Sequence, residues 1–195
     1  MNKLSLTLLT ALILCLAIGC QDKAAMAELE AIKAQTKVES QNKTLVNRYI
    51  DIINTRNYDD LKELLSPDYA VYNPSGHPEP TSRDKLIENY KGAAEAFTEF
   101  SWEIKDIVSA KDKVVARIMI NGTTKAGLPG LPKSSQKFEF SMISIMRVED
   151  GKIIEEWQED DQLGFARQLG MELKAKERDK LEKRQDSYPR KLSST

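Results

Sequence analysis

A chain of 195 residues is long enough for one domain with a sizeable core and some additional segments. It carries 29 Lys and Arg against 30 Asp and Glu, a formal net charge of -1, which argues against a nucleic-acid-binding protein. Its two cysteines and single histidine give no zinc-binding pattern, and no glycine-rich phosphate-binding motif occurs. The sequence therefore predicts neither a metal site nor a nucleotide site.

Residues 1–19 are predicted to be a bacterial lipoprotein signal peptide. A short cationic start at Lys3 precedes a mostly apolar run, residues 4–18, that is too short to span a bilayer comfortably. The run ends in Leu16-Ala17-Ile18-Gly19-Cys20, which resembles a lipobox, so Cys20 is the predicted lipid attachment site. An ordinary signal peptide and a buried apolar helix are the alternatives.

Lipidation at Cys20 would anchor the protein to a membrane of the bacterial cell envelope. Cys15 would leave with the signal peptide, so the mature chain would have no free thiol and no disulfide. Several acyl chains hold a protein to a bilayer far better than one chain does. Gln21 follows the cysteine, and in a Gram-negative cell this residue indicates the outer membrane, facing the periplasm.

Residues 20–40 are predicted to form a helical tether. The segment is rich in Ala, Glu, Lys and Gln and contains no Gly or Pro. Its few apolar residues after Cys20 are Met26, Leu29, Ile32 and Val38, together with alanines. We expect a solvated helix that lifts the domain off the membrane, with a small coiled coil as the alternative.

The predicted domain, residues 41–171, begins with helices. Residues 42–57 carry large apolar side chains at three- and four-residue spacing, which predicts a core-facing helix. A second short helix over residues 58–65 ends at Ser66-Pro67, and a short strand covers residues 69–73. A capping box opens a third helix over residues 81–97.

Four strand candidates follow these helices: residues 99–109, 113–122, 136–148 and 152–161. They are joined by Lys111-Asp112, by a loop rich in Gly and Pro, and by Asp150-Gly151, which is a strong hairpin signal. Helices followed by hairpin-linked strands predict an α+β fold with an antiparallel sheet packed on helices. Several strands are apolar on both faces, so the second face needs a cover, which helices, a ligand or a second copy of the chain in a homodimer would provide.

The end of the domain carries a distinctive motif. Alternation along the last strand places Ile153, Glu155, Trp157, Glu159 and Asp161 on one face if no bulge intervenes. A short amphipathic helix then runs to Gly170. The succession Asp-Gly-Lys-Ile, Glu-x-Trp-x-x-x-Asp, Leu-Gly and Gln-Leu-Gly resembles the closing motif of the SnoaL-like ester (polyketide) cyclases, which have an NTF2-like fold.

This resemblance runs from near Asn42 to about Met171. It implies a curved antiparallel or mixed sheet that closes over about three helices into a cone with a pocket. It also implies an intramolecular aldol ring closure of a polyketide ester, for which no metal, nucleotide or flavin cofactor is required. By the same resemblance Asp161 is the catalytic acid/base, and an apolar wall such as Trp157 could raise its pKa from about 3.9. The alternative role for Asp161 is to cap the final helix.

The chain departs from the family where many cyclases have histidines. Tyr72-Asn73, Thr124 and Glu156 stand at three such positions, and the single histidine, His77, is predicted to be a solvated loop residue. Stabilisation of an enolate would then come from Tyr72, Asn73 or Arg117. The residues predicted to line an apolar ligand pocket are Trp102, Trp157, Tyr72, Phe138 and Met142.

The sequence thus predicts a lipid-anchored, cyclase-like protein that takes a small apolar carbonyl compound and acts through Asp161. The alternative is a non-catalytic NTF2-like module that binds a hydrophobic small molecule or an envelope partner, and a third is a structural protein that dimerises through its sheet. The missing histidines favour binding, whereas Trp157 and Asp161 favour catalysis. Residues 172–195, with eight basic and five acidic side chains, are predicted to be a solvated charged tail.

Overall fold

The computed structural model describes residues 3–127 and 134–171, with side chains from residue 23 onward. Its helices are α1 (Lys3–Thr55), α2 (Leu61–Leu64), α3 (Arg83–Ala96) and α4 (Gln162–Gln168), and a 3-10 turn, η1 (Tyr58–Asp60), precedes α2. Its strands are β1 (Leu65–Tyr72), β2 (Thr81–Ser82), β3 (Phe97–Ala110), β4 (Lys113–Thr124), β5 (Lys137–Glu149) and β6 (Lys152–Asp160). The charged tail predicted over residues 172–195 lies outside the described residues.

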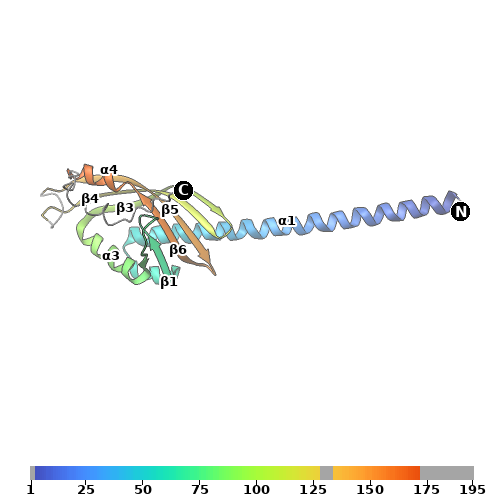
Figure 1. Ribbon diagram of the computed structural model, residues 1–195, viewed down its shortest axis with the longest axis horizontal. Coiled ribbons are helices and arrows are strands. Elements are labelled where there is room, and N and C mark those ends of the chain that lie inside the picture. Colours follow the sequence, from blue (N-terminus) through green and yellow to red (C-terminus); the bar gives the residue numbers. More distant parts are fainter. Residues whose placement is uncertain (1–2, 128–133, 172–195) are drawn as a thin grey trace, which may run out of the picture.

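These strands form one six-stranded sheet in the order β2-β1-β6-β5-β4-β3. β1 runs parallel to β6, and every other neighbouring pair is antiparallel. The predicted hairpin at Asp150-Gly151 joins β5 to β6, and both residues have positive φ (49° and 73°), as tight hairpin turns require. The sheet curves over α1 and α3 (Figure 1), which confirms the predicted α+β fold with a mixed sheet.

The hydrophobic core lies between the inner face of the sheet and the last four turns of α1. Val46, Tyr49 and Ile53 of α1 are at most 1% exposed. They pack with the inward side chains of β4, where Val114, Ala116, Ile118 and Ile120 alternate with more exposed residues. This period-two burial is what a strand with one covered face requires.

α1 is longer than the sequence suggested. The tether predicted over residues 20–40 and the core helix predicted over residues 42–57 form one continuous helix that ends at Thr55 (Figure 1). Before the domain, its apolar side chains at positions 26, 29, 32 and 38 are all at least 47% exposed. Within the described part of the chain, no helix is both long and apolar enough to cross a membrane.

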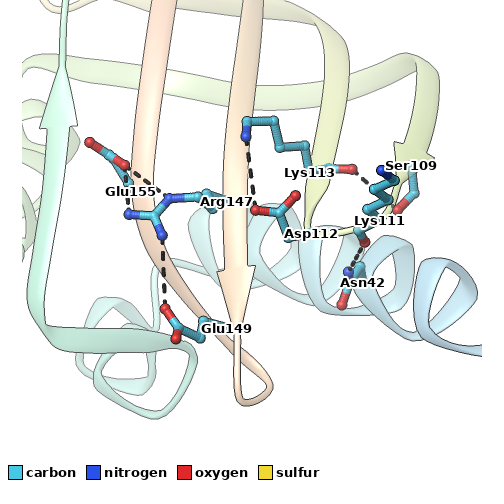
Figure 2. A network of polar contacts seen from close by, with 8 residues as sticks. All are labelled: Asn42, Ser109, Lys111, Asp112, Lys113, Arg147, Glu149 and Glu155. Carbon is cyan, nitrogen blue, oxygen red and sulfur yellow. Dashed lines mark hydrogen bonds and ion pairs between the residues drawn. The ribbon is translucent and has the colours of Figure 1, made fainter. Parts of the chain in front are cut away.

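The β3–β4 turn is fastened to α1 where the helix enters the domain (Figure 2). The Asn42 side-chain amide donates to the Lys111 carbonyl oxygen at 3.1 Å, and the Lys111 backbone N–H donates to Glu39 at 3.1 Å. On neighbouring strands, Arg147 donates twice to Glu155, at 2.8 and 3.0 Å. The contacts of Asn42 and Glu39 fix the turn relative to the helix, and the Arg147–Glu155 pair ties β5 to β6.

A bulge in β6 changes which residues face the core. Val148 of β5 pairs with Ile153, but the preceding Arg147 pairs with Glu155, so Ile154 is an extra residue in β6. One inserted residue exchanges the two faces of a strand for every position beyond it. Ile153 is therefore buried, and so are Glu156 and Gln158. The alternation predicted for residues 153–161 fails at this bulge.

The outer face of the sheet carries an apolar row across five strands. Residue pairing places Val108, Val115, Ile145, Trp157 and Tyr72 side by side on β3, β4, β5, β6 and β1. The rings of Trp157 and Tyr72 stack with centroids 6.4 Å apart and planes 11° from parallel. Trp157 thus belongs to this outer row.

Candidate functional site

A cavity of about 460 Å³ lies between the inner face of the sheet and helices α3 and α4. Apolar and aromatic side chains make up most of its wall, and its polar groups come mainly from Asn73 after β1, from β6 and from the helices. The lining residues are Val71, Asn73, Thr81, Leu86, Asn89, Tyr90, Ala93, Phe97, Phe100, Trp102, Ile120, Phe138, Phe140, Met142, Gln158, Asp160, Gln162 and Phe165. A volume of this size accommodates a small organic molecule.

One part of the wall is a cluster of phenylalanines. Phe165 of α4 contacts Phe138 and Phe140 of β5 with ring centroids 4.9 and 5.0 Å apart, and Phe97 meets Phe138 at 5.2 Å. Edge-to-face contacts of this kind add to the stabilisation gained from burying the rings. Gly122 is needed here, because a Cβ at that position would lie 2.6 Å from the Phe138 ring. α4 therefore closes the cavity by placing an aromatic ring over the sheet.

Trp102 of β3 is held in the wall by α1. The Asn54 side-chain oxygen accepts a hydrogen bond from the Trp102 backbone N–H at 2.7 Å, and the Asn54 side-chain nitrogen donates to the Trp102 carbonyl oxygen at 2.8 Å. The ring meets Tyr90 edge-on, with centroids 5.8 Å apart. Its indole Nε1 is the one buried side-chain polar atom without a hydrogen-bond partner among the described residues. A buried donor of this kind costs free energy unless something accepts from it.

A chain of amides forms the polar part of the wall. Gln162 donates to the side-chain oxygen of Asn73 at 3.3 Å, and Asn73 donates to that of Gln158 at 2.9 Å. Gln158 in turn donates to Glu156 Oε1 at 2.7 Å. Because each amide nitrogen points to the next acceptor, the whole chain runs in one direction and ends at the carboxyl group of Glu156.

Glu156 is fully buried directly behind the cavity wall. Besides Gln158, it accepts from Ser144 Oγ and from the Tyr69 hydroxyl, each at 2.5 Å, with Tyr49 OH at 3.5 Å. Burial raises the pKa of Glu156, while these hydrogen bonds oppose the rise. Burial and the nearby Glu156 charge raise the pKa values of Tyr49 and Tyr69 well above normal, so both phenols stay protonated and able to donate.

Two neighbouring aspartates at the end of β6 have different surroundings. Asp160 lines the cavity. Asp161 is the N-cap of α4 and is exposed; its carboxylate accepts from the Gly164 backbone N–H at 2.8 Å. A side chain on Gly164 would collide with this carboxylate, which explains the small residue there. The sequence left two roles open for Asp161, catalysis and helix capping, and the structure shows the geometry of the helix cap.

Four residues that the sequence predicted for the pocket line the cavity: Asn73, Trp102, Phe138 and Met142. Tyr72 and Trp157 lie outside it, because the bulge in β6 turns Trp157 to the outer face, where Tyr72 stacks on it. Arg117 also lies outside, since it belongs to the exposed residues of β4 and pairs with Asp106 at 2.5 Å. His77 is exposed and contacts the Glu79 carbonyl oxygen through Nδ1 at 2.7 Å.

Sequence reasoning missed several residues of the site. The sequence pattern does not single out Gln158, Asp160 and Gln162 as site residues, and it marks Glu156 only as a residue that stands where many cyclases have histidine. The residues of β6 share one signal: polar side chains stand at every second position, 156, 158 and 160, on the face that would ordinarily pack against the core. That signal becomes visible only once the bulge at Ile154 sets the phase.

The profile of the SnoaL-like polyketide cyclases matches residues 43–169. The chain belongs to this family, which confirms the resemblance given by the closing motif. It is similar to the aklanonic acid methyl ester cyclase DnrD of Streptomyces peucetius, with 28% identity over 131 residues, 65% of this chain and 88% of that protein.

Solved structures agree with the assignment of the fold. The chain is similar to TsrD from Streptomyces laurentii, with 27% identity, a TM-score of 0.59 and coverage of 68% of this chain and 96% of that one. It is also similar to IdmH from Streptomyces antibioticus, with 26% identity, a TM-score of 0.59 and coverage of 66% and 98%. The lipoprotein signal peptide lies outside the matched residues and stays a prediction.

Proposed function

We propose that this chain binds a small apolar carbonyl compound in the cavity and cyclises it by cofactor-independent acid/base chemistry. The observation that carries the proposal is the cavity itself, a pocket of about 460 Å³ with phenylalanines along one part and a carboxylate with amides along another. Such a wall would hold an apolar body by burial and orient an oxygen by hydrogen bonds. Membership of a cyclase family supports the reaction class.

In the proposed reaction the Asp160 carboxylate takes a proton from the carbon next to one carbonyl group of the substrate. The resulting enolate carbon attacks a second carbonyl carbon of the same molecule, so that a C–C bond forms and the second oxygen becomes an alkoxide. The proton then passes from Asp160 to that alkoxide, and the product is an isomer of the substrate. N–H groups of Asn73 and Gln158 are the candidates for stabilising the enolate oxygen.

Asp160 takes the role that the sequence predicted for Asp161. A general base must reach the proton that it removes, directly or through one water molecule. Asp160 lines the cavity, whereas the Asp161 carboxylate is bound to the backbone at the start of α4. In this proposal Asp161 acts on the site only by holding α4, and with it Phe165, over the sheet.

The second candidate function is binding without turnover. The observation that favours it is the absence of Lys, Arg and His from the cavity wall formed by the described residues. Without a positive charge, an enolate would depend on neutral donors alone, which stabilise a developing negative charge less strongly than charged ones do. A binding module would need the apolar wall and the donors but would not need Asp160 to be ionised.

Native mass spectrometry of the purified full-length chain would identify compounds that co-purify with it, and those compounds become the test substrates. We expect turnover in the wild type, loss of turnover in Asp160→Asn, and retained turnover in Asp161→Asn, which serves as the matched control. Ligand binding without turnover in the wild type would favour the binding module. Loss of turnover in Asp161→Asn at unchanged stability, with Asp160→Asn active, would return the catalytic role to Asp161.

Attachment to the bacterial envelope through Cys20 is part of the proposal. Between Cys20 and Asn42, α1 would extend for about 33 Å at 1.5 Å per residue, enough to hold the domain clear of lipid headgroups. Metabolic labelling with an alkyne fatty acid should label the wild type and leave Cys20→Ser unlabelled. Label retained by Cys20→Ser would disprove this attachment site.

A homodimer through the sheet is also proposed, supported by the apolar row on its outer face. Val108 and Val115 of this row are 62% and 39% exposed, and Ile143 beside it is 50% exposed. Burying such side chains against a second copy would remove them from water. Sedimentation should show a dimer that Val115→Lys converts to a monomer; a monomeric wild type would refute the interface.

A further inference from the structure

The direction of the amide chain has a cause outside the cavity. An amide side chain has similar shapes in its two orientations, so hydrogen-bond partners decide which end is the nitrogen. At the inner end of the chain stands Glu156, whose two oxygens face Ser144, Tyr69, Tyr49 and Gln158. A carboxylate accepts hydrogen bonds and does not donate them, so the NH₂ group of Gln158 must face it.

The orientation of Gln158 then sets that of Asn73. With its nitrogen on Glu156, Gln158 turns its oxygen to Asn73, which must present its own nitrogen, 2.9 Å away. The Asn73 oxygen is in turn occupied by Gln162. The oxygens of Gln158 and Asn73 thus each accept a bond already, whereas each nitrogen carries one further N–H, and that of Gln158 lies against the Tyr90 hydroxyl. At the inner end, beside Glu156, the group that the wall offers is a donor.

A second donor lies in the same wall without a partner. Trp102 Nε1 is buried and unpaired among the described residues, and Trp102 contacts Tyr90, which also lines the cavity. The Tyr90 hydroxyl is 2.9 Å from that of Tyr49, which reaches Glu156 at 3.5 Å. The unpaired indole N–H of Trp102 and the remaining amide N–H of Asn73 favour a ligand that brings an acceptor oxygen.

We propose that Glu156 is the positioning residue that keeps the amides of Gln158 and Asn73 turned with their N–H groups available, so that the cavity selects a ligand by an acceptor oxygen such as a ketone or ester carbonyl. Glu156 does not touch the ligand; it acts through Gln158. The inference rests on the proposed function, because it assumes that the cavity binds a small organic molecule. Beyond the proposed function, it states that the recognised group of the ligand is a hydrogen-bond acceptor and names Glu156 as the residue that determines this.

The test compares two compounds with one carbon skeleton, 2-acetylnaphthalene and 1-(2-naphthyl)ethanol, by calorimetric titration of the full-length chain. The ketone can only accept at its oxygen, whereas the alcohol can also donate. We expect the wild type to prefer the ketone. In Glu156→Gln the new amide can donate to Gln158 and turn it over, so the ratio of ketone to alcohol affinity should fall by about fivefold or more. If Glu156 had a purely structural role, Glu156→Gln would lower the affinities for both compounds by the same factor and leave their ratio unchanged.

Glu159→Gln is the matched control, because it makes the same chemical change on the same strand, outside the cavity lining, and should leave the ratio as it is. If Glu156→Gln does not fold, Gln158→Leu removes the donor itself while Ser144 and Tyr69 still serve Glu156. It too should lose the ketone preference. A ratio that stays at the wild-type value in a folded Glu156→Gln or in Gln158→Leu would overturn the inference while the proposed binding stands. If the wild type bound neither compound, the proposed function and the inference would fall together.

Discussion

The two faces of β6 differ in chemistry although their residues alternate along one short strand. The inner face carries Glu156, Gln158 and Asp160, which are linked to the cavity, and the outer face carries Trp157 in an apolar row. Polar residues thus lie inside and the large aromatic residue outside, the reverse of the usual arrangement. Buried polar groups need hydrogen-bond partners, and here tyrosines, a serine and amides provide them for Glu156 and Gln158. This inversion supports the proposed function, in which the inner face of β6 serves a ligand more than packing.

A second inserted residue is the most direct way to break the distinction between the two faces. One alanine inserted between Glu155 and Glu156, beyond the bulge, would turn the remainder of β6 over, so that Trp157 and Glu159 would face the core and Glu156 would leave its partners. We expect loss of more than about 4 kcal/mol of unfolding free energy, or no folded protein. Chemical denaturation measures the loss. Ile154→Ala, which keeps the residue count and the register, should cost about 1 kcal/mol. An insertion as mild as that would contradict the claim that the two faces of β6 cannot be exchanged.

Removing one donor to the inner carboxyl group tests the polar network. Tyr69→Phe leaves Glu156 buried with one hydrogen bond fewer, and we expect a loss of about 1–3 kcal/mol of unfolding free energy. Tyr72→Phe, on the outer face, is the control and should change the free energy by less than about 0.5 kcal/mol. Thermal melts of the two variants give the comparison. Equal effects would mean that the inner face is no more demanding than the outer one.

The pH dependence of the unfolding free energy tests the buried carboxyl group of Glu156 on the inner face of β6. The pKa of Glu156 is raised in the folded chain by burial among Tyr49, Tyr69, Tyr90, Ser144 and Gln158, so the folded state holds its proton more tightly than the unfolded state does. The stabilisation from that proton is complete below the ordinary pKa of about 4.5 and is lost as the pH rises through the raised value. For one proton the slope cannot exceed about 1.4 kcal/mol per pH unit.

Wild type and Glu156→Gln should therefore be unfolded with urea at a series of pH values from 4 upward. We expect the unfolding free energy of the wild type to fall relative to that of the variant as the pH increases above about 4.5. The difference between the two proteins removes the contribution of every other titrating group. A wild type that gains stability relative to Glu156→Gln over the same range would show that the carboxyl pKa is not raised.

The smallest expected effect separates the two aspartates at the end of β6. Asp161→Ala removes the cap of α4 and should cost about 1 kcal/mol of unfolding free energy. Asp160→Ala removes a carboxylate that lines the cavity and should change stability by less than about 0.5 kcal/mol. Chemical denaturation of both variants suffices. A larger loss in Asp160→Ala would show that its carboxylate has a structural partner.

Much of the fold could be predicted from the sequence because its signals are local. The Asp150-Gly151 hairpin, the alternation in β4 and the apolar spacing over residues 42–57 each follow from a few neighbouring residues. The site could be predicted only in part, since Asn73, Trp102, Phe138 and Met142 line the cavity but Trp157 and Arg117 do not. For Trp157 the difference arises at Ile154, because an added residue in one strand is determined by pairing with β1 and β5 and not by its own sequence. Arg117 lies on the exposed face of β4, opposite the buried residues of that strand.

Because α1 is at once the projecting helix and the core helix of the domain, the two parts share one rigid axis. No Gly or Pro interrupts the chain from Cys20 to Thr55, and the contacts of Asn42 and Glu39 with Lys111 clamp the helix where it enters the domain. Because the helix is continuous, a torque or tension applied at its projecting end would be transmitted directly to Tyr49 and to the tyrosines around Glu156. If that end is held at a surface, the rigid helix fixes the orientation of the cavity relative to the surface, which a flexible linker would not do.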